Sequence, residues 1–220
     1  LLGGNTSFEA DVTSSSDLAL DAIQFRAVAM AAASGLTVVT GGAGTGKTTV
    51  VRAVLQTLSD SIAVVAAPTG RAAERLRSAL GGVEQLRGSF TVAKLLANPG
   101  LLAGADILVV DEAGFLDLRA ASRLFHLVRE LGARGPRRVV LVGDPNQLSS
   151  IGPGAVLRDL IMARRREARL LPQEVLTTGF RSDDALQSFG GSVLRGAPDF
   201  SLIEHWDVPD RGVERAVLEF

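Results

Sequence analysis

A glycine-rich turn between an apolar run and a helical pattern constrains this chain more than any other feature. Residues 38–50 read VVTGGAGTGKTTV, in which Gly41, Gly46, Lys47 and Thr48 have the spacing of a P-loop. The glycines allow backbone N–H groups to wrap around phosphates, and the following helix adds a dipole that favours anions. The turn therefore predicts a nucleoside triphosphate site, placed where a strand of an α/β sheet leads into a helix.

The rest of the chain alternates between strand-like and helix-like patterns. Short apolar runs predict strands at Leu36–Thr40, Ile62–Ala66, Ile107–Asp111, Arg138–Val142 and Glu174–Thr177. Helices are predicted near Asp17–Ala33, Lys47–Leu58, Arg71–Leu80, Thr91–Ala97, Leu118–Leu131, Ala155–Ala163 and Asp183–Leu194. Strands this apolar are usually buried on both faces. We therefore expect an α/β P-loop NTPase fold, with a mostly parallel sheet and helices on both faces.

Composition narrows the class of protein. Of 220 residues, 46% are hydrophobic and 21% charged, which is ample for a core. The net charge of −1 leaves only a local patch for nucleic acid, and the absence of cysteine fits a reducing cytoplasm. The two histidines are too few for a convincing zinc site. No apolar run is long enough for a transmembrane helix.

The chain divides into three expected segments. Residues 1–16 are predicted to be a flexible arm, residues 17–196 an ATPase domain, and residues 197–220 the start of a truncated second domain, because the pattern changes near Ala197. The first residue is not Met, so we expect a piece of a longer protein.

The P-loop assigns roles to its own residues, with ATP and Mg²⁺ as the expected cofactors. Lys47 is expected to reach the β- and γ-phosphates, and the Thr48 hydroxyl to ligate magnesium. Gln24 can read adenine with one donor and one acceptor, although a plain helix-surface residue explains it equally well. The expected nucleotide-binding residues are Gln24, Gly42, Ala43, Gly44, Thr45, Gly46, Lys47, Thr48 and Thr49.

Three later segments supply candidate partners for the P-loop. Asp111 ends an apolar run and is expected to hold magnesium, while Glu112 can act as general base toward water. Gln147 follows another buried run and Arg181 follows the last; both are candidates for contact with the γ-phosphate. An acidic turn, a loop residue and a surface arginine are the simpler alternatives. Lys47, Glu112, Gln147 and Arg181 form the predicted catalytic set.

These residues carry a family resemblance. The ordered set is Gln24, GGAGTGKTT (41–49), AAPTGRAAERL (66–76), FTVAKLL (90–96), VVDEAG (109–114), VLVGDPNQLSSIGPGAVLRDLI (140–161) and LTTGFRS (176–182). It resembles the first motor domain of superfamily-one DNA helicases of the RecD-like branch, to which the helicase portions of conjugative relaxases are related. The resemblance covers roughly residues 17–196, and the stretch 142–161 is its most specific part.

The resemblance implies more than the P-loop does. It implies a RecA-like domain that moves five-prime to three-prime on single-stranded DNA, with a second motor domain across the ATP site. It also implies subunits of a nuclease or conjugation complex as possible partners. The DNA-binding residues that it implies are Pro68, Thr69, Gly70, Arg71 and Thr91.

A local basic patch and two departures from the family qualify this picture. The patch that net charge would hide could be formed by Arg71, Arg75, Arg77 and Lys94. Gly114 stands where relatives often carry Ser, and Ala93 where many carry His. The departures weaken a link between the ATP and DNA sites and one DNA contact.

Two other functions fit a P-loop. An ATP-binding regulatory or adaptor module with little turnover is the main alternative, and the intact catalytic set argues against it. A nucleotide kinase or GTPase is a further one, but no acceptor lid or guanine-specifying Asn-Lys-x-Asp segment is visible.

Overall fold

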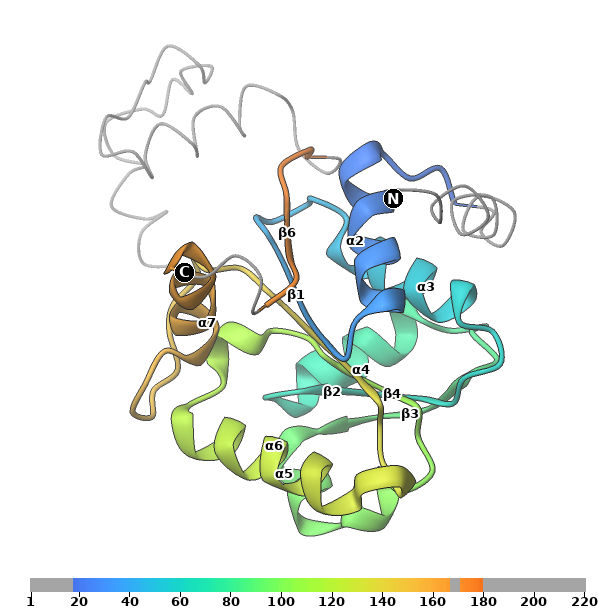
Figure 1. Cartoon of the computed structure of the whole chain (residues 1–220), viewed down its shortest axis with the longest axis vertical. Helices are drawn as coiled ribbons and strands as arrows, with labels where there is room; N and C mark the ends of the chain where they lie inside the picture. Colours follow the sequence, from blue (N-terminus) through green and yellow to red (C-terminus); the bar gives the residue numbers. More distant parts are fainter. Residues whose placement is uncertain (1–17, 167–170, 180–220) are drawn as a thin grey trace, which may run out of the picture. The chain divides into compact units, whose positions relative to one another are not determined.

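Six strands form one sheet in the order β3-β2-β4-β5-β1-β6 in the computed structural model, which describes residues 18–166 and 171–179 (Figure 1). The strands are β1 (Leu36–Gly41), β2 (Ala63–Ala67), β3 (Leu86–Thr91), β4 (Ile107–Val110), β5 (Arg138–Gly143) and β6 (Gln173–Leu176). All five pairings between them are parallel. The predicted α/β class with a parallel sheet is therefore confirmed.

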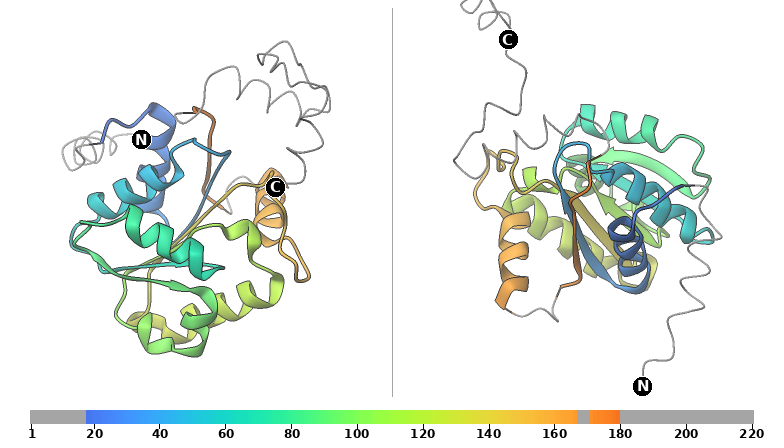
Figure 2. Two further views of the ribbon diagram at one scale, coloured as in Figure 1. Left: turned by 180° about the vertical axis from the view of Figure 1, so that it is seen from behind. Right: turned by 90° about the horizontal axis from the view of Figure 1, so that it is seen from above.

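Helices cover both faces of the sheet, as predicted. They are α2 (Ala22–Ala33), α3 (Lys47–Thr57), α4 (Gly70–Ala79), α5 (Val92–Ala97), α6 (Leu118–Leu131) and α7 (Val156–Arg166), with short 3-10 turns at Pro99–Leu101, Ala113–Phe115 and Gly132–Arg134. One core packs beneath α2, α3 and α4, and the other beneath α5, α6 and α7 (Figure 2). None of the helices in the described ranges is both long and apolar enough to cross a membrane.

Alternation along each strand builds the two cores. Val38 faces one core and Val39 the other, and Leu108 and Val109 repeat this arrangement on β4. All four side chains are fully buried. Successive strand residues point to opposite faces, and each such side chain contributes about 1.5–3 kcal/mol when buried. The continuous apolar runs are thus explained by a sheet with no solvent-exposed face at its centre.

The structure differs from the sequence expectations in two places. Strand β3, with the sequence LRGSFT, was not predicted, because its mixed polarity fits an edge strand that is only partly buried. Helix α2 starts at Ala22, and Asp21 is its N-cap. Asp17, where the sequence predicted this helix to begin, the expected helix at 183–194 and the segments 1–16 and 197–220 lie outside the described residues.

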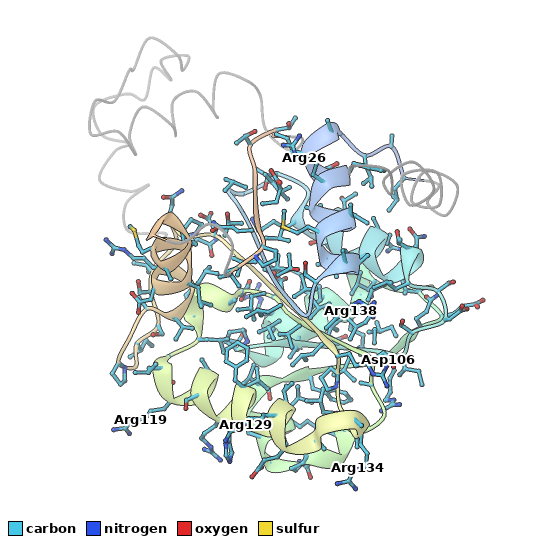
Figure 3. The ribbon with its side chains drawn as sticks, in the orientation of Figure 1. Arg26, Asp106, Arg119, Arg129, Arg134 and Arg138 are labelled. Atoms are coloured by element: carbon cyan, nitrogen blue, oxygen red, sulfur yellow. The ribbon has the colours of Figure 1, made fainter. Side chains whose placement is uncertain are left out.

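At the amino ends of the central strands, polar side chains form hydrogen bonds with backbone groups of neighbouring segments. The Asp106 Oδ2 atom accepts a hydrogen bond from the Ile62 N–H at 2.9 Å. Arg138 donates from Nε to the Ala32 carbonyl, also at 2.9 Å; Figure 3 labels both side chains. Ligands of parallel sheets bind at the other edge, beyond the carboxyl ends of the strands. The candidate site lies there.

Candidate active site

Three of the predicted catalytic segments follow three adjacent strands. The P-loop follows β1, Asp111 and Glu112 follow β4, and the turn with Gln147 follows β5, which lies between the other two. The register pairs Val110 with Leu141 and Leu141 with Val38, so the three strands run together toward one edge. Groups far apart in the sequence therefore meet at a single edge of the sheet.

The P-loop backbone depends on glycine. Gly44 and Gly46 have φ of 77° and 78°, in the left-handed region that side chains disfavour. A Cβ on Gly41 would lie 2.4 Å from the Thr45 hydroxyl oxygen and 3.0 Å from the Leu176 Cβ. The Thr45 hydroxyl itself donates to the Gly42 carbonyl at 3.0 Å. The loop is thus closely packed and internally hydrogen-bonded.

Lys47 lies inside the P-loop. From the first turn of α3, its Nζ donates to the carbonyls of Gly41 at 2.7 Å and Gly42 at 2.6 Å. Its charge also lowers the pKa of Asp111, as one of the smaller influences on that carboxyl. The ammonium therefore stands between the glycine turn and the acidic end of β4, which suits contact with a phosphate chain.

Asp111 is a partly buried carboxyl directly after β4. Burial raises its pKa, and the hydrogen bond from the Glu112 N–H, at 2.9 Å, lowers it. The neighbouring Glu112 charge raises the pKa again, whereas Arg75 and Lys47 lower it; the net pKa lies above the ordinary value. A partly buried carboxylate of this kind is stabilised by a cation.

The residues present fit a magnesium ion held mainly by phosphate and water. The described residues contain no group of three or more His, Asp or Glu side chains that could hold a metal by themselves. Mg²⁺ bound to a nucleotide usually keeps several waters and takes only one or two protein oxygens. Asp111 would supply a carboxylate oxygen, and Thr48 would supply a hydroxyl from the start of α3.

Glu112 has an unusual backbone. Its φ of 52° and ψ of 37° place it in the left-handed region, alone among the non-glycine residues that the structure describes. Such conformations cost on the order of 1–3 kcal/mol and gather at functional sites. The side chain is 23% exposed and forms an ion pair with Arg75 of α4. The backbone thus turns the carboxylate out of the strand direction and toward α4.

The two residues predicted to contact the γ-phosphate are Gln147 and Arg181, and the structure describes only Gln147. Gln147 is exposed, and its N–H donates to the Asp144 carbonyl at 3.3 Å, which forms a tight turn just after β5. It follows β5, the strand paired with β1, and its predicted role stays a prediction. Arg181 lies outside the described residues.

Gln24 lies against the P-loop and is only 2% exposed. Its Oε1 accepts from the Asp21 N–H at 3.1 Å, and its Nε2 donates to the Thr45 carbonyl at 3.3 Å. Both amide atoms therefore bond to the protein, and reading adenine would require exchange of these contacts. The structure assigns Gln24 a second role that the sequence analysis missed, since it completes the capping box of α2.

The start of α2 also contacts the end of β6. Burial raises the pKa of Asp21, but hydrogen bonds from the Gln24 amide and the Thr178 hydroxyl lower it below its ordinary value. Arg26 pairs with Glu174 of β6 at 3.2 Å, near the upper end of the sheet in Figure 3. Helix α2 is thereby tied to the strand that leads toward Arg181.

The predicted DNA-binding residues also gather at this edge, on the neighbouring strands. Ala67 pairs with Thr91, so β2 and β3 end side by side. Thr69 caps α4 by accepting from the Ala72 N–H at 3.2 Å, and Thr91 caps α5 by accepting from the Lys94 N–H at 3.1 Å. These hydroxyls therefore have a structural role, whether or not they contact DNA.

A hollow of about 540 Å³ lies beside the predicted DNA-binding residues. Pro68 and Ala93 line it together with Phe115, a candidate for base stacking for which a core role is the simpler alternative, and with Arg119 and Arg123, which were not predicted as site residues. Gly70 and Arg71 are exposed at the start of α4. At Gly114, a Cβ would meet the Asp144 carbonyl at 3.4 Å, an ordinary contact, so the backbone does not require glycine there.

The comparisons with known proteins agree with this geometry. Residues 19–187 match a family described as AAA domain. The RecBCD enzyme subunit RecD of Mycolicibacterium smegmatis is 34% identical over 212 residues, which cover 81% of this chain and 36% of that protein. The ATP-dependent RecD2 DNA helicase of Deinococcus radiodurans is 37% identical over 139 residues, covering 58% of this chain and 18% of that protein.

Solved structures support the fold. The crystal structure of Bacteroides Pif1 bound to ssDNA superposes with a TM-score of 0.61 at 18% identity, covering 92% of this chain and 56% of that one.

The chain spans about a third or less of the length of the two curated relatives, at 36% and 18%. By sequence, the chain belongs to the AAA domain family over residues 19–187, and the RecD and RecD2 proteins are among its relatives.

Proposed function

We propose that this domain hydrolyses ATP, with Mg²⁺, as the motor of a DNA helicase or translocase. The observation that carries the proposal is the strand order β4-β5-β1, which brings Asp111, Glu112 and the P-loop to one edge. The names of the RecD and RecD2 relatives support helicase activity over other uses of a P-loop.

The residues divide the chemistry among them. The P-loop N–H groups and Lys47 bind the phosphates, for which Lys47 must leave the carbonyls of Gly41 and Gly42. Thr48 and Asp111 would hold the magnesium ion, which would supply charge neutralisation to the phosphates. Glu112 takes a proton from the attacking water, and the water oxygen forms a bond to the γ-phosphorus. The bond between the γ-phosphorus and the β–γ bridging oxygen breaks, which gives ADP and phosphate.

We further propose that Gln147 and Arg181 contact the γ-phosphate and that Gln24 contacts adenine. Single-stranded DNA lies along Pro68, Thr69, Gly70, Arg71 and Thr91, because these residues share the carboxyl edge with the ATP site. An exposed arginine and the N-terminus of a helix can both bind the phosphates of the DNA backbone. Such contacts do not depend on the DNA sequence. Movement is five-prime to three-prime.

The partners of the intact protein belong to the same proposal. They are a second motor domain and, in a cytoplasmic setting, subunits of a nuclease or conjugation complex. The name of the RecD relative, a subunit of the RecBCD enzyme, supports the nuclease setting.

An ATP-binding adaptor with little turnover is the second candidate. It is favoured by two contacts, since Lys47 is bonded to P-loop carbonyls and Glu112 to Arg75, so both side chains are engaged within the protein. The motor requires that these contacts open in turnover.

ATP hydrolysis by the intact protein, with and without an oligothymidine strand, separates the two candidates. The motor predicts stimulation by DNA, and the adaptor predicts ATP binding without turnover. Lys47→Ala serves as the test of the site itself, because loss of a charge-assisted contact or two should cost about 1.5–3 kcal/mol each in ATP affinity. Unchanged affinity in titration with a fluorescent ATP analogue would remove Lys47 from the site.

A further inference from the structure

Arg75 connects the edge of the sheet proposed to bind DNA with the base proposed to activate water. It lies on α4, one turn after Arg71, and residues four apart share a helix face. Its Nη2 donates to the Glu112 Oε1 atom across 37 residues of sequence. A single guanidinium is therefore placed between the two functions of the domain.

The ion pair engages Glu112 in a way that opposes catalysis. A general base must have a carboxylate oxygen within hydrogen-bond reach of the attacking water. The Oε1 atom is bonded to Arg75, and the Glu112 N–H is bonded to Asp111 at 2.9 Å. The left-handed backbone, with φ of 52°, holds the carboxylate on the side of α4. Arg75 thus restrains the base.

The restraint is weak enough to be released. The Arg75 side chain is 68% exposed, so it is open to solvent and to other anions. Exposed ion pairs change an equilibrium constant by a factor of only about 1.4 to 5. A DNA phosphate offers a guanidinium two oxygens and can bind it in a bidentate manner. Phosphate bound along α4 can therefore compete successfully with one carboxylate oxygen.

We propose that Arg75 is a positioning residue that couples DNA to ATP hydrolysis: without DNA it holds Glu112, and a DNA phosphate takes Arg75 and frees Glu112 to face the water. This inference rests on the proposed function of the domain. The size of the ion pair limits the effect, so release of Arg75 accounts for a factor of about two to five in rate. Any larger stimulation by DNA must come from other parts of the protein.

The test uses Arg75→Ala in the intact protein. ATP turnover without DNA should rise about two- to five-fold, turnover at saturating oligothymidine should stay the same, and the stimulation factor should fall accordingly. Arg75→Lys, which keeps the charge, should restore most of the restraint. Glu74→Gln is the matched control, because it removes the Arg77–Glu74 pair of the same helix and should leave the DNA-free rate unchanged.

Two further measurements separate this role from a merely structural one. In a Glu112→Gln background, Arg75→Ala should no longer change single-turnover hydrolysis, since it acts through the carboxylate. In a plot of the logarithm of DNA affinity against the logarithm of salt concentration, the slope should become shallower by about 0.7. This is the contribution of one phosphate contact on a single strand. Loss of a purely structural contact would still change hydrolysis in the Glu112→Gln background and would leave the salt dependence of DNA binding unchanged.

The outcomes separate the proposed function of the domain from the proposed role of Arg75. A wild-type protein whose hydrolysis ignores DNA would overturn the proposed function. DNA-stimulated wild-type hydrolysis, combined with an Arg75→Ala rate that is unchanged or lower without DNA, would overturn the role of Arg75 alone.

Discussion

The turns after β1 and β5 belong to strands that are paired in the sheet, but the protein holds them differently. The P-loop is closed by its own contacts: Thr45 is 7% exposed, and its hydroxyl bonds to Gly42. After β5, Gln147 is exposed, Leu148 is 83% exposed and Ile151 is fully exposed. The difference teaches that the turn proposed to bind phosphate is held by contacts within this domain, whereas the turn proposed to carry the γ-phosphate contact Gln147 presents exposed apolar side chains.

Large exposed apolar patches mark interaction surfaces, and Leu148 and Ile151 lie three residues apart on one segment. The proposed second motor domain is the partner that we expect there, because an ATP site that closes between two lobes needs a surface beside its γ-phosphate contact. This makes the comparison testable: changes to the β5 side should act through the partner, and changes to the P-loop should act within this chain.

The largest expected effect comes from restoring the partner. Residues 1–220 alone should bind ATP but hydrolyse it slowly, because an arginine supplied across the cleft is worth about 10³–10⁵ in rate. Turnover of the intact protein should exceed that of the 220-residue chain by a comparable factor, measured by phosphate release with DNA present. Robust strand displacement by the 220-residue chain would show that the ATP site needs no second lobe, or that self-association supplies it.

The next effect concerns the proposed general base. Glu112→Gln keeps the size of the side chain but removes its ability to take a proton. Turnover of the intact protein should fall by about 10²–10⁴. Affinity for ATP should stay near that of the wild type in titration with a fluorescent analogue. A similar loss in both quantities would point to a structural role, through the left-handed turn at Glu112.

A smaller effect, in stability, should distinguish two adjacent glycines of the P-loop. Gly41→Ala should lower the free energy of unfolding by about 1–3 kcal/mol, since its Cβ would lie 2.4 Å from the Thr45 hydroxyl and 3.0 Å from Leu176. Gly42→Ala is the matched control: nothing lies within 4 Å of its Cβ, and its φ is not positive. Urea denaturation measures both, and equal losses would contradict the close packing described for Gly41.

Much of this architecture could be predicted from the sequence where a local pattern determines it. The apolar runs predicted five of the six strands, and the P-loop spacing predicted the turn between β1 and α3. Strand β3 was missed because an edge strand needs no continuous apolar run. The Gln24 contacts with Asp21 and Thr45 were missed because a buried amide and an exposed one look alike in sequence.

The pair between Arg75 and Glu112 shows the limit more clearly. In the sequence, Arg75 stands out only as part of a basic patch, since nothing in the local pattern points it toward Glu112. Their contact depends on β2 and β4 being neighbours in the sheet, which sets the start of α4 beside the end of β4. Pairing of strands is a property of the whole fold, and single-sequence patterns do not contain it.

The smallest effect concerns the partly buried carboxyl at the edge. Because burial raises the pKa of Asp111 in the folded protein, folding favours its protonated form. The wild type therefore loses stability as the pH rises from the ordinary value of 3.8 through the raised pKa, and this loss persists at neutral pH. Asp111→Asn lacks the ionisation, so it should melt at a higher temperature than the wild type at pH 7, in the absence of magnesium and nucleotide. The difference in melting temperature should shrink below the ordinary carboxyl pKa, where both side chains are neutral.

Thermal melts at several pH values measure this difference. A variant less stable than the wild type at pH 7 would contradict the prediction. It would show that the hydrogen bond from Glu112 and the charges of Arg75 and Lys47 outweigh the cost of burial.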